Sequence, residues 1–259
     1  MATSMTHHWT STQYVYRSPS VVFHSVLPLM GLLGSVFSGR SFRLVAKYFL
    51  KKQLNNDEAA STTLHPDRIL EQCCKRGLIR RFRKDQYRWQ HDKIQEAALS
   101  MMDRKEVDEV QYKMGMVLMD GLSTEQLDEM LFVVANLLHA KNVATDPPGH
   151  DPRDQRTNSK VQLKIIQLNL RAGQKAINAG LFVPAFTYLS RGIHQLPSDY
   201  WKSRPDLSLE LFSKGAQSAF CNGNFEDVKF YMYCENVREK IIRKERKIRN
   251  LKKKKKIHI

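Results

Sequence analysis

The sequence predicts a mostly α-helical protein with one small β-hairpin, followed by an array of paired helices. Three observations lead to this prediction. Apolar residues recur at helical spacing over most of the chain after residue 92. Two short β-favouring runs, LIRRF and YRW, flank a polar turn around Lys84, Asp85 and Gln86. The last third of the chain repeats a pattern of small and aromatic residues after a shift of 43 positions, from Ala176 to Ala219.

Composition and charge narrow the class of protein. The 259 residues are 42% hydrophobic and 26% charged, which is ordinary for a globular chain of one or two domains. The net charge of +16 is concentrated at the end, where twelve Lys or Arg residues and two Glu residues between Arg238 and Lys256 leave a local charge of +10. Such a tail can bind nucleic acid or anionic lipid, serve as a nuclear address, or be a solvated helix end.

The first 91 residues favour a leading segment and then a winged-helix domain. Residues 1–20 are expected to be a disordered lead, and the chain has no Asp or Glu before Asp57, a bias shared with organelle transit peptides. The apolar run from residue 21 to residue 37 is interrupted by His24, Ser25 and Pro28, so no membrane span is expected. Helices are predicted over 24–34, 41–53 and 65–77, the first two joined by a Gly/Ser turn and the last ending at Gly77. Helices followed by a hairpin give a winged-helix pattern over 21–91.

From residue 92 to residue 236 the sequence predicts a helical array. The stretch STEQLDEMLFVVANLLHA is expected to form one helix that begins with a capping box of Ser123 and Gln126. Proline, glycine and charge interrupt the pattern over 142–158, which predicts a flexible loop. Small residues let helices approach closely, and aromatic residues fill the grooves between them, as in tetratricopeptide-like arrays. Residues 237–259 are expected to form the basic tail.

The internal repeat aligns four pairs of residues: Ala176 with Ala219, Gly180 with Gly223, Phe182 with Phe225, and Tyr188 with Tyr231.

Two sets of residues are candidates for binding. Large aromatic side chains of the array are candidate contacts for a protein or peptide partner, and the alternative is that most of them fill grooves between helices: Phe182, Tyr188, Trp201, Phe225 and Tyr231. Four basic side chains of the hairpin would contact phosphates: Arg80, Arg81, Arg83 and Lys84. The helix predicted before the hairpin adds Arg68, Lys75 and Arg76 to this surface. The same hairpin could also be a solvated surface or an intramolecular docking face.

No complete catalytic constellation is found, and we expect no enzyme activity, cofactor or metal. Residues 34–41 differ at one position from the pattern of a phosphate-binding P-loop. Gly34, Gly39 and Ser41 match the pattern, but Arg40 replaces its lysine. The adjacent pair His91 and Asp92 could contribute to a metal site, but further ligands are lacking. The alternative is that Asp92 caps a helix, with Gln95 three residues later. The four cysteines have neither zinc-finger nor secreted-disulfide spacing, which favours an intracellular and cytoplasmic protein, with a nuclear location open through the basic tail.

The order of these motifs resembles the region that follows the nucleotide-binding core in STAND-class, AAA-like signalling ATPases of hybrid serine/threonine kinases and sensor histidine kinases. The stretch YRWQHDKIQEAAL carries the resemblance most clearly, through Trp89, His91, Asp92, Lys93, Ile94, Gln95, Ala97 and Ala98. Upstream, similar positions are Gly34, Phe37, Leu44 and Val45. Downstream, they are Leu168, Asn169, Ala172, Gly173, Ala176, Ala185, Tyr188, Leu189 and Gly192.

The resemblance covers about residues 24–235 and implies a regulatory, protein-binding module. Its partner would be another protein or the nucleotide-binding domain of a related ATPase. No residue of this sequence matches the motifs by which that family hydrolyses ATP, so the resemblance implies a fragment, a degenerate paralogue or a separate adaptor. The alternative function is nucleic-acid binding through the winged helix and the polybasic tail.

Overall fold

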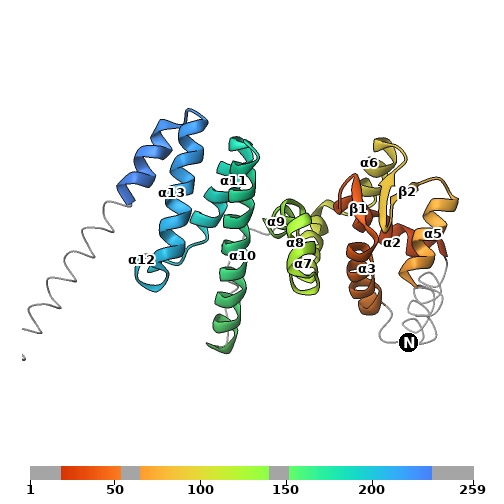
Figure 1. The fold of residues 1–259 in the computed structure, drawn as a ribbon. Helices are drawn as coiled ribbons and strands as arrows, with labels where there is room; N and C mark the ends of the chain where they lie inside the picture. The colour runs from red at the N-terminus through yellow and green to blue at the C-terminus, as the bar shows by residue number, and fades with distance from the viewer. Residues whose placement is uncertain (1–18, 54–64, 140–151, 235–259) are drawn as a thin grey trace, which may run out of the picture. The chain divides into compact units, whose positions relative to one another are not determined.

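The computed structural model describes residues 19–53, 65–139 and 152–234, and it divides into two compact units (Figure 1). The first unit extends to Lys141 and the second begins at Asn142. The described part of the chain is mostly helical, with one small antiparallel sheet, as the sequence predicts. The predicted lead over 1–20, apart from its last two residues, and the tail over 237–259 lie outside the described residues.

The first unit alternates helices and short strands and then continues as helices alone. Its elements are α2 (Pro19–Leu32), β1 (Val36–Ser38), α3 (Gly39–Gln53), α5 (Pro66–Lys75), β2 (Ile79–Arg83), β3 (Gln86–Trp89), α6 (Asp92–Ser100), α7 (Arg104–Gly121), α8 (Thr124–Glu129) and α9 (Leu131–His139).

The sheet has the order β1-β3-β2, with both pairs antiparallel. The hairpin of β2 and β3 agrees with the prediction, but β1 is a strand where the sequence predicts a Gly/Ser turn. Phe37 of β1 pairs with Tyr87 of β3, and Ile79 of β2 pairs with Trp89. These four side chains are buried, so one face of the sheet packs against helices of the unit.

The helices after the hairpin belong to the first unit rather than to the repeat array. Helix α6 packs against α2, and Gln95 donates a hydrogen bond from Nε2 to the carbonyl oxygen of Gly31 at 2.9 Å. Helix α7 packs against α3. The Ser41 hydroxyl of α3 also donates a hydrogen bond to the sulfur of Met130, at the end of α8, at 2.6 Å. The boundary between the two compact units lies at residue 141, because α6 packs on α2 and α7 packs on α3 within the first unit.

The local signals around these helices are only partly as predicted. Gly77 adopts a left-handed conformation with φ of 69° after α5, as expected for a helix end. Ser123 and Gln126 form the predicted capping box at the start of α8. The single helix predicted after them is instead interrupted at Met130, whose φ of −99° and ψ of 12° lie outside the helical region.

The second unit consists of helices that pack in sequence order, with α10 against α11 and α11 against α13. Its elements are α10 (Pro152–Asn178), α11 (Phe182–His194), α12 (Tyr200–Ser203) and α13 (Pro205–Cys221), and residues 225–234 are also helical. The flexible loop predicted over 142–158 is wrong for its last seven residues, since α10 begins at Pro152; the rest of that range lies outside the described residues.

The two halves of the repeat have the same turn geometry. Gly180 has φ of 72° and Gly223 has φ of 73°, and a Cβ atom at either position would meet nothing within 4 Å. The amide that follows each glycine donates to the carbonyl oxygen five residues earlier, from Leu181 to Ala176 at 2.8 Å and from Asn224 to Ala219 at 2.9 Å. This bond is the signature of a Schellman helix end. Each turn therefore joins two helices in the same way.

Candidate functional site

The outer face of the small sheet is basic and exposed to solvent. Arg80 and Arg88 are cross-strand partners on this face, and Val36 pairs with Arg88 from the other side. Arg80 and Arg88 are both exposed, and Val36 is 39% exposed. Arg88 was not among the predicted anion contacts, although its place between the apolar residues Tyr87 and Trp89 assigns it to the outer face of the strand.

A β-bulge places Phe82 in the middle of this basic face. The register shifts between Arg81, which pairs with Tyr87, and Arg83, which pairs with Gln86, so Phe82 is the extra residue. The Phe82 ring is 45% exposed. The guanidinium carbons of Arg83 and Arg88 lie 5.2 and 5.5 Å from its centre, within the range of cation–π contacts.

The predicted hairpin cations do not all share this face. Arg80 and Arg83 contribute to it as described, whereas Arg81 lies over the Tyr87 ring at 5.9 Å, beside the buried side of the sheet. Lys84 is exposed in the turn. We define the cationic face as Val36, Arg80, Phe82, Arg83 and Arg88.

Asp85, in the turn of the hairpin, forms hydrogen bonds to the start of α3. Its carboxylate accepts a hydrogen bond from the Arg40 amide at 3.0 Å and one from Nη2 of Arg43 at 2.7 Å. Its carbonyl oxygen accepts from the Gly39 amide at 2.8 Å. Arg43 also donates from Nε to Asp67 of α5 at 2.6 Å, and the bond to Asp85 is the largest cause that raises the pKa of this guanidinium above its usual value.

The hydrogen bonds to Asp85 argue against a phosphate-binding P-loop at residues 34–41. In a P-loop, the amides at the helix start bind phosphate. Here the amides of Gly39 and Arg40 are already bonded to Asp85, and Ser41 is buried with its hydroxyl on a methionine sulfur. The geometry of this segment is that of a helix capped by a distant carboxylate.

The predicted role of Asp92 as a helix cap is wrong. The N-cap of α6 is His91, whose Nδ1 accepts a hydrogen bond from the Lys93 amide at 3.1 Å. Asp92 is the first helical residue, where its charge still favours the helix dipole. Imidazole is not among the common capping groups, so the sequence signal favoured the aspartate. Within the described ranges, no group of three or more His, Cys, Asp or Glu residues is placed to hold a metal.

The five aromatic candidates of the second unit divide by burial. Tyr188 and Tyr231 are buried, and the Tyr231 hydroxyl lies 3.1 Å from that of Ser190. Trp201 is half-buried and stacks on Phe212 with ring centres 5.3 Å apart, while Phe182 is also half-buried. These four residues largely fill grooves between helices, and among the five only Phe225 presents most of its ring to solvent, with 57% exposed.

Two exposed apolar residues of this unit, Leu181 and Val183, lie at the start of α11, and a larger set lies at the hairpin formed by α13 and residues 225–234. We call this set the open end, because no described helix covers it: Phe220, Phe225, Phe230, Met232 and Tyr233, which are between 52% and 67% exposed. The rings of Phe220 and Phe225 contact each other edge to face, with centres 6.0 Å apart. Clustered exposed rings of this kind mark interaction surfaces more often than single exposed apolar residues do.

The repeat explains why these residues are exposed. Met232 is equivalent to Leu189, which is fully buried in a cluster with Ile166, Leu170 and Leu211. Leu211 belongs to α13, so α13 is the helix that covers Leu189 in the first half of the repeat. Met232 has the same place in the second half but is 52% exposed. No helix of the described residues therefore occupies the position equivalent to α13 in the second half.

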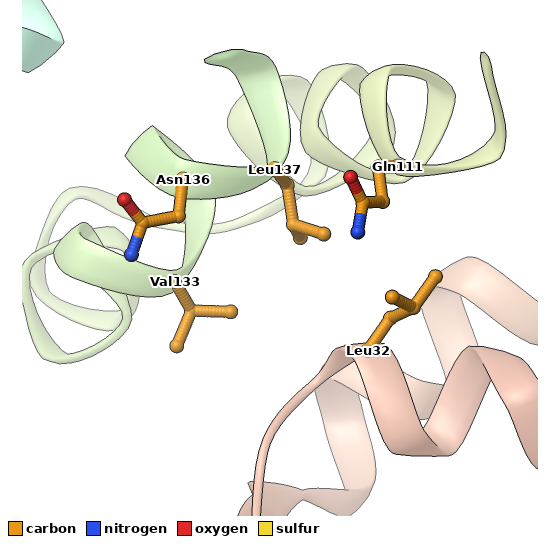
Figure 2. Close-up of a pocket in the computed structure, with 5 residues that line it drawn as sticks. All are labelled: Leu32, Gln111, Val133, Asn136 and Leu137. Atoms are coloured by element: carbon orange, nitrogen blue, oxygen red, sulfur yellow. The ribbon is translucent and has the colours of Figure 1, made fainter. Parts of the chain in front are cut away.

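One hollow of the first unit lies between the end of α2 and helices α7 and α9, with a volume of about 210 Å³ (Figure 2). Leu32 faces Leu137 and Gln111 across it, and Val133 and Asn136 complete the lining. The volume is below the usual range for small-molecule sites, and the lining carries no ionisable group. We assign no function to it.

Comparisons of this chain with protein-family models, with curated proteins and with solved structures found no match. In the part of the chain that the structure describes, no helix has the length and apolarity needed to cross a membrane. All four cysteines are free thiols. Burial raises the pKa of the Cys73 thiol to about 12, which keeps it protonated and unreactive at neutral pH.

Proposed function

We propose that this protein is a regulatory interaction module whose second unit docks an amphipathic helix of a partner protein on the open end. The observation that carries the proposal is the difference between Leu189 and its repeat equivalent Met232. One is covered by a helix of the same chain, and the other faces solvent. A helix with the apolar spacing of α13 would bury both Met232 and Phe220, as α13 buries the first half of the repeat.

The resemblance to STAND-class signalling ATPases supplies the class of partner. In this proposal, residues 19–91 form a winged-helix domain and residues 152–234 form part of a tetratricopeptide-like array. The order of helices and strands in the first unit and the two equivalent turns of the second support this assignment. The docked helix would come from a related nucleotide-binding protein, and this chain would relay or gate its signal without catalysis of its own.

The test is site-specific photocrosslinking in cells that make the full chain. A benzoylphenylalanine at position 232 should give one discrete adduct with a second protein. The same probe at position 167, an exposed glutamine of α10, is the matched control and should not give that adduct. The crosslinked peptide should map to a segment with apolar residues three and four positions apart, as expected for a docked helix.

A second variant separates loss of docking from loss of folding. Phe220→Ser removes an exposed ring and should weaken the adduct from position 232 at least fivefold while the circular dichroism of the chain is unchanged. Equal adducts from positions 232 and 167 would refute the proposal, and so would the absence of any adduct. Adducts formed only between two copies of this chain would replace it with self-assembly.

A further inference from the structure

We infer that the cationic face of the small sheet binds single-stranded nucleic acid, with Phe82 as a stacking platform and the arginines as phosphate contacts. This site lies in the first unit and is independent of the open end. The inference rests on the composition of the face, on the bulge that exposes Phe82 and on the charge of the surfaces beside it.

The charge of the face is unbalanced. Among the described residues, no ion pair joins Arg80, Arg83 or Arg88 to a carboxylate. The one carboxylate of the hairpin, that of Asp85, is bonded to Arg43 and to the start of α3. The face therefore offers three uncompensated guanidinium groups to an anionic partner.

Helix α5 is a poorer candidate, although it is the element that would enter a DNA groove in a winged-helix domain. Lys75 is paired with Glu71 at 2.7 Å, and Asp67 is paired with Arg43. Carboxylates thus alternate with cations along α5, and they would repel the phosphates of a duplex. The charge complementarity favours the sheet over the helix.

The exposed ring selects the form of the nucleic acid. Bases in a duplex are stacked on one another and cannot lie on a protein ring, whereas the bases of a single strand can. The guanidinium groups of Arg83 and Arg88 lie near the Phe82 ring, and Arg80 lies across the strand from Arg88. A base that stacks on Phe82 would place its flanking phosphates within reach of these arginines. Guanidinium groups bind phosphate oxygens through two parallel hydrogen bonds, which suits this role.

The experiment measures binding of the full chain to a fluorescent 20-nucleotide oligothymidine by anisotropy at several salt concentrations. The basic tail will bind any polyanion, so each variant is compared with a control of equal charge. Arg80→Gln with Arg88→Gln removes two charges from the face. Lys202→Gln with Arg204→Gln removes two exposed charges from the second unit.

The face variant should weaken binding at least tenfold more than the control variant. Its plot of log affinity against log salt should flatten by about 1.4, because each lost phosphate contact on a single strand contributes about 0.7. Phe82→Ala should weaken binding by about fivefold or more, in line with the loss of one stacked base. Phe82→Trp should retain the affinity, and Phe225→Ala, which removes a still more exposed ring in the second unit, should have no effect.

Three outcomes would overturn the inference. Equal losses in the two charge variants would assign all binding to the tail. Binding of a duplex of the same length with equal affinity, and without any effect of Phe82→Ala, would assign the face to backbone contact with double-stranded DNA. Competition by polyglutamate that matches the oligonucleotide at equal charge, again without any effect of Phe82→Ala, would leave only a general polyanion surface.

Discussion

Replacement of Asp85 should destabilise the first unit through three separable contributions. The carboxylate caps the start of α3, with Oδ2 3.0 Å from the Arg40 amide. It forms an ion pair with Arg43, with Oδ1 2.7 Å from Nη2. Asp85 also has φ of 58°, a left-handed conformation that aspartate tolerates better than alanine.

The magnitudes follow from these roles. Loss of a helix cap costs about 1 kcal/mol, loss of a part-exposed ion pair costs about 0.5 kcal/mol, and alanine in the left-handed region costs about 1 kcal/mol. Asp85→Ala should therefore lower the free energy of unfolding by about 2 to 3 kcal/mol. Asp85→Gly avoids the backbone penalty and should cost about 1 to 2 kcal/mol. Asp85→Asn keeps an acceptor and the backbone tolerance, so it should cost about 0.5 to 1 kcal/mol.

The assay is urea unfolding followed by circular dichroism, with hydrogen exchange of the Arg40 amide as a local readout. Asp92→Ala is the matched control, because Asp92 is an aspartate beside the start of a helix, α6, that does not cap it, whereas Asp85 caps α3 from the hairpin turn. The control should cost about 0.5 kcal/mol through the helix dipole. An Asp85→Ala variant no less stable than Asp92→Ala, or a series in which asparagine costs as much as alanine, would refute this account of the turn.

Three further predictions concern packing and reactivity. Leu189→Ala should cost about 2 to 5 kcal/mol because it leaves a cavity, whereas Met232→Ala at the equivalent exposed position should cost less than about 0.5 kcal/mol in urea unfolding. Gly173→Ala should cost about 1 to 3 kcal/mol by thermal unfolding, because its Cβ would lie 2.5 Å from Cγ of Leu189. Iodoacetamide at pH 7 should label exposed Cys221 in the native protein and buried Cys73 only after unfolding, as peptide mass spectrometry would show.

The features that the sequence predicted correctly depend on neighbours along the chain. The hairpin around residue 85, the helix end at Gly77 and the capping box of Ser123 and Gln126 each need only residues within a few positions of one another. Backbone preference and short-range hydrogen bonds decide such features, so one sequence is enough to identify them.

The features that the sequence analysis missed depend on distant partners. Strand β1 has three residues, and it is a strand because Phe37 pairs with Tyr87, fifty positions away. Asp85 looks like an ordinary turn residue until its carboxylate is seen on α3. Phe82 lies between Arg81 and Arg83 in the sequence, and only the fold shows that its ring is exposed beside the guanidinium groups of Arg83 and Arg88. The winged-helix and tetratricopeptide assignments and the family resemblance stay predictions.

The internal repeat shows where local and distant control separate in this protein. Gly180 and Gly223 have nearly the same φ because each ends a helix with the same local bonds. Leu189 and Met232 have equally matched positions, yet one is buried and the other exposed, because burial depends on the helix that comes next. A sequence repeat therefore predicts its own turns but not its own surface. No described helix follows the second half of the repeat to cover Met232, and for this reason the open end is where we expect a partner helix to bind.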